Sequence, residues 1–336
     1  MIVKYYWMGL IDIIKETNVP KVLLRYIMMN FLDLASIKIL ILTIKEMNIL
    51  DDFSKKFLEK AIMGFNWNCE NGHLDVAQWF YLVDNVDIHA NNERAFILSC
   101  ENGHLDVAQW LHSLDSIDIR ANKKAFPWSC INGHHYVAQW LHSLGNIDIH
   151  YENDCLFCQV CSRGHLDTAQ LLYSIGGVDI YAENDDAFEW ACFHGYLNVA
   201  QWLNSLDNIR LDDYNTFVLA CGNGKLNVAK WLYSLGNINI HDHNENAFTH
   251  TCKTGKLNVA KWLYSLGNVN IHANNEDAFV EACIANNLDT AQWLYSLGNI
   301  NIHVDNDRVF HESKGKTKKW LETLYYKRKP NKGKNI

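Results

Sequence analysis

The sequence lacks both a hydrophobic run long enough to cross a membrane and a recognisable secretion signal. Its most apolar stretch, IKILILTI from Ile37 to Ile44, ends at Lys45, whereas a membrane-spanning helix needs about 20 apolar residues. The N-terminal string MIVKYYWMGLIDIIKE has no ordered basic region, apolar region and small-residue cleavage site. These absences argue against a membrane protein and predict an intracellular location, in the cytoplasm of the host or source cell.

Signatures of catalysis and cofactor binding are missing as well. The chain contains neither a glycine-rich loop that cradles phosphate nor a recognisable nucleophile–base arrangement. Nearly every polar residue type stands in a position that recurs along the chain, whereas catalytic groups occur once at a defined place. We therefore expect no enzymatic activity, no catalytic residues and no cofactor.

Ten cysteines are present, but their spacing argues against a disulfide framework. Neighbouring helical layers pack roughly 8–10 Å apart, while a disulfide needs Cα atoms within roughly 7 Å. Equivalent cysteines of adjacent layers are therefore too far apart to bond, and reduced thiols in small core positions fit an intracellular protein. Eight cysteines recur about every 31 residues, namely Cys69, Cys100, Cys130, Cys161, Cys192, Cys221, Cys252 and Cys283.

These eight cysteines mark an internal repeat. A Phe lies four residues before each of them, a Gly three after and a Trp ten after, except that Asn286 replaces the Gly and Leu171 the Trp once each. A ninth, truncated repeat begins at Phe310. The first to eighth repeats are named in order by their ladder phenylalanines, Phe65, Phe96, Phe126, Phe157, Phe188, Phe217, Phe248 and Phe279.

Each repeat predicts a short helix, a turn, a second helix and an extended loop. The recurring Gly ends the first helix, because it adopts the left-handed conformation without a Cβ clash. The broad apolar stripe of LDVAQWLHSL suits a second helix packed between two layers, with its Trp in the core and not on a base-stacking platform. Residues 237–240, Asn-Ile-Asn-Ile, alternate with a period of two, which predicts a half-buried strand.

The strings NGHLDVAQWL and LGNIDIH resemble the ankyrin repeat, whose second half commonly reads N-G-H-L-E-V-V-K-L-L followed by G-A-D-V-N-A. The resemblance covers residues 65–324 and implies an all-α ankyrin-repeat solenoid of helix-turn-helix units joined by short β-hairpin-like loops. The family's Thr-Pro-Leu-His opening is absent, and each repeat is a few residues shorter than usual. This short, Trp-rich form resembles the ankyrin proteins that giant DNA viruses of amoebae encode in many copies.

Residues 1–64 precede the repeats and leave two interpretations open. They form either a degenerate helical layer that caps the array, because terminal repeats must be atypical, or an F-box-like segment. The F-box resemblance rests on Pro20, Leu23 and Leu24 and the string FLDL at residues 31–34, and it needs one inserted residue. It would imply docking on a Skp-type adaptor of a cullin ubiquitin ligase.

The remaining boundaries enclose an array at residues 65–313, a truncated terminal repeat at 314–324 and a basic, disordered tail at 325–336. Residues 314–336 carry a net charge of +8 and residues 1–64 a net +2, which leaves −18 for the array in a chain of −8. Such an array repels nucleic-acid phosphates and attracts a partner with a basic surface. The tail is either a nuclear-import signal or a solvated end. We expect a monomer that binds neither nucleic acid nor membrane.

Two groups of potential metal ligands have a simpler explanation. The string CLFCQVC places Cys155, Cys158 and Cys161 close together, and His150 or His165 would complete a zinc set. However, Cys161 belongs to the recurring core ladder, and no C-x-x-C pair exists elsewhere in the chain. A ladder of loop histidines is interpreted as exposed polar groups, because the layers are too far apart for two of them to share a metal. No metal site is predicted; the ladder comprises His89, His150, His241, His272 and His303.

The positions that vary most between repeats are the pairs after the ladder Phe and after the ladder Cys. Exposed aromatic and Arg side chains at such positions are favoured anchors for a partner. The array is therefore predicted to bind another protein on its concave face, with a substrate adaptor acting through residues 1–64 and a structural or virion-associated protein as alternatives. The predicted partner-binding residues are Trp128, Ile131, Arg163, Trp190, Phe193, His194 and Lys253.

Overall fold

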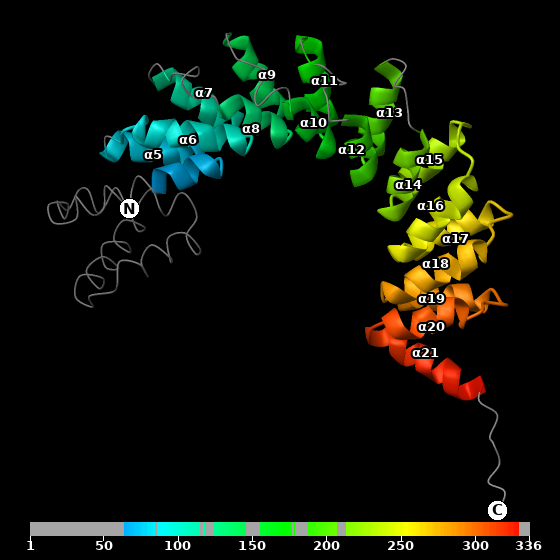
Figure 1. The fold of residues 1–336 in the computed structure, drawn as a ribbon. Coiled ribbons are helices and arrows are strands. Elements are labelled where there is room, and N and C mark those ends of the chain that lie inside the picture. The colour runs from blue at the N-terminus through cyan, green and yellow to red at the C-terminus, as the bar shows by residue number, and fades with distance from the viewer. Residues whose placement is uncertain are drawn as a thin grey trace, which may run out of the picture. The chain divides into compact units, whose positions relative to one another are not determined.

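A computed structural model describes residues 64–84, 86–114, 117, 124–145, 155–176, 178, 187–206 and 213–328 (Figure 1). The chain divides into two compact parts, Met1–Tyr151 and Glu152–Ile336. We call these the N-terminal part and the C-terminal part and describe each by itself. Both interpretations of residues 1–64 concern a segment that lies, but for Gly64, outside the described residues.

The N-terminal part alternates first and second helices. Residues 64–70 form the first helix of the first repeat, and α6 packs on both α7 and α8. The remaining pairs follow the same order, so each turn at the ladder Gly joins two helices of one layer. The bounds are α5 Leu74–Asp84, α6 Ala90–Glu101, α7 Leu105–Leu114, α8 Ala125–Ile131 and α9 His135–Ser143.

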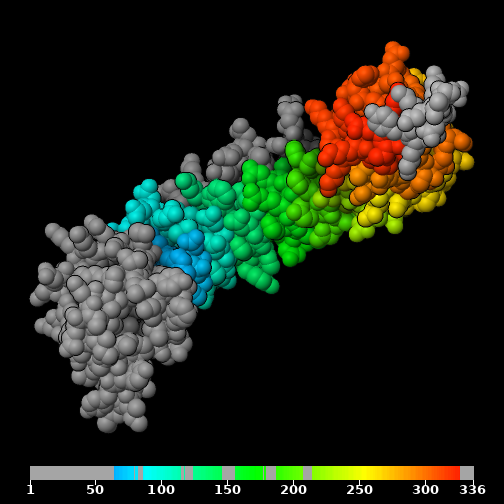
Figure 2. Space-filling view, turned by 90° about the horizontal axis from the view of Figure 1, so that it is seen from below, coloured from blue at the N-terminus to red at the C-terminus, as the bar shows by residue number. Residues whose placement is uncertain are grey.

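The C-terminal part continues the pattern. Its first helices pack on one another in succession and each on its own second helix, and in Figure 1 the two sets lie on opposite sides of this part. Figure 2 shows the repeats from green to red as adjoining bands. The bounds are α10 Cys155–Ser162, α11 Leu166–Ile175, α12 Ala187–His194, α13 Leu197–Leu206, α14 Asp213–Gly222, α15 Leu226–Ser234, α16 Asp242–Lys253, α17 Leu257–Ser265, α18 Ala273–Ile284, α19 Leu288–Ser296, α20 Val304–Glu312 and α21 Gly315–Arg328.

The core follows the Phe and Cys ladders. All eight ladder phenylalanines are at most 3% exposed, and all eight ladder cysteines are fully buried and stand outside any disulfide. Burying one Phe side chain contributes roughly 1.5–3 kcal/mol, so the ladder is a large share of the apolar driving force. The prediction that these cysteines fill core positions is confirmed.

The ladder Gly serves two purposes at the turn between the helices. It adopts a positive φ, for example 81° at Gly103, and Asn286 adopts 61° where Asn replaces it. A Cβ at Gly103 would also overlap the ring of His134 from the next repeat. The residue after a ladder Gly covers the preceding ladder Gly at six positions, which explains why Gly predominates there: Gly72, Gly103, Gly164, Gly195, Gly224 and Gly255.

The loops between repeats differ from the expected β-hairpins. Ile238 and Ile240 are buried and the flanking asparagines exposed, as the alternation predicts, but the described residues contain no strand. Each fully described loop instead makes a left-handed turn of three residues with positive φ. In the seventh repeat these are His243, Asn244 and Glu245. The alternation reflects packing of single isoleucines on the layer below, without a strand ladder.

Glu245 explains why a left-handed turn is stable here. A left-handed residue other than Gly costs roughly 1–2 kcal/mol, and this one buries its carboxylate at 6% exposure. Its Oε1 accepts a hydrogen bond from the backbone N of Asn270 in the next loop at 3.1 Å. The Nδ1 of His241 lies 2.8 Å from the same oxygen. Glu276 repeats the arrangement one layer on, with Asn301 N at 3.2 Å and His272.

The loop histidines are thus more than solvated polar groups. Each described ladder His lies within 3.3 Å of a carboxylate four residues later, and in two layers that carboxylate also ties the next loop. The sequence interpretation overlooked this pairing, because it treated the His position and the acidic position separately.

The ladder tryptophans lie between layers and not fully inside the core. Trp262 is half-buried; its ring lies 6.2 Å from Phe217 of the preceding repeat and 6.1 Å from Tyr233. The same contacts recur for Trp293. The prediction that the ladder Trp lies in the core is therefore refined: its ring is half-buried and packs between neighbouring repeats.

The ninth repeat closes the described array. Helix α21 buries Leu321 and Thr317, and Trp320 contacts Phe279 at 6.4 Å and Tyr295 at 5.7 Å. Trp320 occupies the ladder Trp position although it follows Phe310 more closely than in the other repeats, which is why the register missed it. The helix runs to Arg328, past the expected start of a disordered tail at residue 325.

Candidate protein-binding surface

The two variable positions of the first helices meet across neighbouring repeats. We call the second residue after the ladder Phe the A position and the residue after the ladder Cys the B position. Glu281 (A, eighth repeat) lies 3.0 Å from Lys253 (B, seventh repeat). His250 (A, seventh repeat) lies so close to Gly222 (B, sixth repeat) that a Cβ there would overlap its ring. Each variable pair is therefore set jointly by two adjacent repeats.

Helix α12 carries a cluster of three rings, which we call the α12 cluster: Trp190, Phe193 and His194. The Trp190 and Phe193 centroids are 5.5 Å apart, and His194 stacks on Trp190 at 5.7 Å with an interplanar angle of 19°. Positions three and four residues apart lie on one helical face, which brings these rings together. Trp190 remains 41% exposed and His194 is exposed, so the cluster faces solvent.

One aromatic residue, Tyr196, and one basic residue, Arg163, accompany this cluster in the C-terminal part. Tyr196, at the position that covers Gly164, has its ring 6.3 Å from His194. Arg163 is exposed just beyond the end of α10, the first helix packed next to α12. Burial lowers the pKa of His165, and the nearby Arg163 charge lowers it further. His165 is therefore neutral at physiological pH, and Arg163 carries the positive charge of this turn.

The two predicted residues from the third repeat are less available. Ile131 is only 3% exposed and belongs to the core, and Trp128 is half-buried. Both lie in the N-terminal part, whereas α12 lies in the C-terminal part. Ile131 occupies a B position, and here the position is covered. Ile131 is therefore removed from the proposed surface, whereas Trp128 remains partly exposed.

Lys253 is engaged within the protein. Its Nζ pairs with Glu281, whose other oxygen lies 3.2 Å from Arg308, and Arg308 also pairs with Glu312 at 3.1 Å. Partly exposed pairs of this kind contribute about 0.2–1 kcal/mol each. Lys253 thus links two layers, and a partner would have to compete with Glu281 for its ammonium group.

The sequence prediction omitted an exposed aromatic that the structure places in an A position. Trp67 is 39% exposed, and its ring lies 5.5 Å from that of His73. Its signal in the sequence was its register, since Trp67 and Trp190 stand at the same position of their repeats. Trp67 has no second aromatic neighbour like Phe193 among the described ring contacts, so it forms a smaller patch.

The described ranges show no alternative chemistry. Within them, no group of three or more His, Cys, Asp or Glu side chains could hold a metal ion, and no helix is both long and apolar enough to cross a bilayer. Cys158 and Cys161 are buried and stand outside any disulfide, and burial raises the pKa of the Cys161 thiol. The side chain of Cys155 lies outside the described residues.

Stacked helix-turn-helix layers with a shared core and variable exposed positions define an all-α repeat solenoid, a class that binds through surface positions left free by the fold. Residues 217–306, which span the sixth to eighth repeats, match the family model of ankyrin repeats in three copies. The fold is thus an all-α ankyrin-type solenoid.

Two further comparisons complete the picture. The solved structure of the human ASB11 ankyrin repeat domain matches 59% of this chain and 96% of that one, at 15% identity and a TM-score of 0.47. No curated protein matches the sequence.

Proposed function

We propose that this protein is a protein-binding scaffold whose main contact surface is the α12 cluster together with Arg163. The observation that supports this most directly is the group of three rings in mutual contact on a helix whose Ala187, Phe188, Ala191 and Cys192 are buried in the core. Trp190 is 41% exposed, and it stands in a repeat position that varies between Trp, Leu, Gln, His and Glu.

Exposed Trp and Arg side chains supply much of the binding energy in protein interfaces. A helix packed on two neighbours presents them with little conformational entropy left to lose, which favours tight binding. The constant positions hold the fold, so the residues at exposed A and B positions are free to specify the partner. No catalytic role is proposed for any of them.

The partner we propose carries a basic surface. The array has a net charge of −18 over residues 65–313, and charge of one sign speeds the encounter with a partner of the opposite sign. Binding should therefore weaken with added salt, mainly through a slower association rate.

Two variants with matched substitutions test the surface. The full chain is immobilised and used to capture proteins from a cell lysate, and the captured partner's affinity is then measured for Trp190→Ala and Trp67→Ala. Both residues stand at the A position and are similarly exposed. We expect Trp190→Ala to weaken binding about tenfold or more, and Trp67→Ala to leave it nearly unchanged. Equal affinities for the two variants would contradict the proposal.

The adaptor alternative is tested in the same capture with a chain that lacks residues 1–64. Recovery of a Skp-type adaptor and a cullin with the full chain alone would favour an adaptor that selects its substrate through the repeats. Recovery of the same proteins by both chains, without ligase components, would favour the scaffold. A structural or virion-associated role predicts capture of no partner by either chain.

A further inference from the structure

Two consecutive second helices have the same sequence and a changed surface charge. Residues 225–234 and 256–265 both read KLNVAKWLYS, where residues 104–113 read HLDVAQWLHS. The buried Val, Ala and Leu positions are unchanged. Three of the four positions that differ change toward positive charge: His becomes Lys, Asp becomes Asn and Gln becomes Lys.

The resulting lysines are available for binding. Lys230 and Lys261 are exposed at mid-helix, and neither α15 nor α17 contains an acidic residue. None of the four lysines forms an ion pair with a residue that the structure describes. Elsewhere the array is acidic, so a face with this charge needs an explanation beyond solubility. We call Lys225, Lys230, Lys256 and Lys261 the lysine face.

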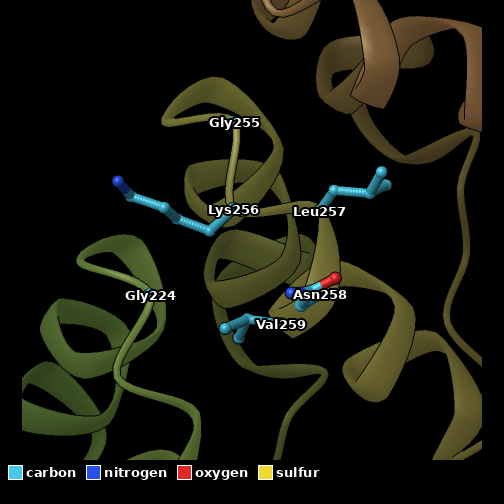
Figure 3. Close-up of a pocket in the computed structure, with 6 residues that line it drawn as sticks. All are labelled: Gly224, Gly255, Lys256, Leu257, Asn258 and Val259. Carbon is cyan, nitrogen blue, oxygen red and sulfur yellow. The ribbon is translucent and has the colours of Figure 1, made fainter.

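Packing fixes the position of two of these lysines. The aliphatic stem of Lys256 lies over the turn of the preceding repeat, where a Cβ at Gly224 would be 3.0 Å from its Cδ. Figure 3 shows this side chain extending past Gly224 with its nitrogen at the free end, beside a small surface pocket. Lys225 lies over Gly195 in the same way. Anchored stems hold the ammonium groups in place while the charges stay in water.

The spacing of the lysines indicates the shape of a ligand. Lys230 and Lys261 stand at equivalent positions in adjacent layers, roughly 10 Å apart. A polyproline II segment rises about 3.1 Å per residue with three residues per turn, so every third side chain lies on one side at about 9 Å intervals. Exposed Asn258 and Tyr264 lie one helical turn either side of Lys261 and add a polar and an aromatic contact.

We propose that the lysine face binds an extended acidic segment of another protein with carboxylates at every third residue. This surface lies on the second helices and the turns before them, whereas the α12 cluster lies on a first helix, so the two are separate. A nucleic acid is the less suitable polyanion, because its phosphates continue past these two layers onto an array of net −18. The scaffold would then engage a basic surface and an acidic segment at different places.

The test uses two labelled synthetic peptides of equal charge, one with Glu at every third position and Pro or Ala between, the other with the same Glu residues contiguous. Fluorescence anisotropy measures their binding to the full chain. We expect the spaced peptide to bind several-fold tighter at low salt, and both to bind weakly at high salt. The substitutions Lys225→Gln, Lys230→Gln, Lys256→Gln and Lys261→Gln together should weaken the spaced peptide about tenfold or more.

A second set of substitutions controls for general charge attraction. Lys314→Gln, Lys316→Gln, Lys318→Gln and Lys319→Gln change the net charge equally at exposed positions near α21. Binding should remain within about twofold of the parent chain. The pair Lys230→Gln and Lys261→Gln, which touches no packed stem, should retain the fold and still lose several-fold in affinity.

Three results would overturn the proposal: equal losses in the two lysine sets, no preference for the spaced peptide, or tighter binding of a single-stranded oligonucleotide of equal charge. Because Trp190→Ala leaves the lysine face intact, it should not affect peptide binding. Failure of the lysine face therefore leaves the α12 proposal standing, and failure of the α12 proposal leaves the lysine face standing.

Discussion

At the scale of single residues, the stability of the repeat depends on positions where even one added carbon atom would clash. The ladder Gly must both adopt a positive φ and leave room for the next repeat's side chain. Gly145 has a similar φ of 84° with nothing within 4 Å of a Cβ. A comparison of the ladder residue Gly103 with Gly145 therefore separates the conformational requirement from the packing requirement.

Replacing the two glycines should give different losses of stability. Gly145→Ala bears mainly the left-handed backbone cost, about 1 kcal/mol. Gly103→Ala adds a clash with His134 and should cost about 1–3 kcal/mol more. Urea unfolding measures both, and His134→Ala should relieve part of the cost of Gly103→Ala in the double variant. An unchanged cost in that double variant would show that the ring contact is unimportant.

The buried thiols make stability depend on alkaline pH. Burial raises the pKa of Cys69 and Cys130 to about 12 from 9.0, and it also raises the pKa of the Cys252 thiol. The folded state therefore keeps protons that the unfolded state releases above pH 9. The contribution of these thiols to the free energy of unfolding is fully present below pH 9. It falls as the pH rises toward the pKa values of the folded state, by up to about 1.4 kcal/mol per pH unit for each thiol.

Cys252→Ala tests this dependence without adding a buried polar atom. We measure the free energy of unfolding in urea, with a reductant, at pH 8, 9 and 10. The variant should release about one proton fewer on unfolding than the parent. Its free energy of unfolding should therefore fall less steeply with pH, by up to about 1.4 kcal/mol per pH unit. Parallel pH profiles for parent and variant would mean that Cys252 releases no proton on unfolding.

At the scale of elements, repetition makes most of the fold predictable. The chain supplies its own alignment, so the two helices, the Gly turn and the Phe and Cys core follow from residue register alone. The left-handed loop turns could not be predicted, because Asn-Asn-Glu at residues 274–276 is compatible with several turns and the buried Glu276 is explained only by Asn301 of the next loop. A truncated terminal repeat was expected at residues 314–324, but the role of Trp320 in α21 was not, because Trp320 is out of register.

Helix α21 should behave as a true terminal layer. Trp320→Ala removes ring contacts with Phe279 and Tyr295 and should destabilise the protein by about 1–3 kcal/mol. Lys318→Ala, at an exposed position of the same helix, should change stability by less than about 0.5 kcal/mol. Thermal or urea unfolding distinguishes them, and equal small effects would mean that α21 does not support the eighth repeat.

The candidate surface was only partly predictable from sequence, for a reason that also belongs to this scale. Variation between repeats marked Trp190, Phe193 and His194 as free of the core, and the structure shows them in contact on one face. The same criterion failed at Ile131, because exposure at a B position depends on neighbouring side chains. Lys253 likewise has its ion-pair partner in another repeat.

At the scale of the whole molecule, a uniform repeated scaffold carries two surfaces that depart from the repeat. The core positions are repeated almost unchanged, whereas an aromatic cluster on α12 and a lysine face on α15 and α17 each depart from the repeat. Such local departures on a constant fold are what a binding module needs, because specificity is set by a few exposed side chains.

The most direct test of the central claim is hydrogen–deuterium exchange of the full chain with and without its captured partner. We expect slowed exchange in α12 and at the end of α10 around Arg163, with the described second helices unaffected by a partner that uses only this surface. Protection confined to other segments, with α12 unchanged, would contradict the claim that the first-helix surface around Trp190 binds the partner.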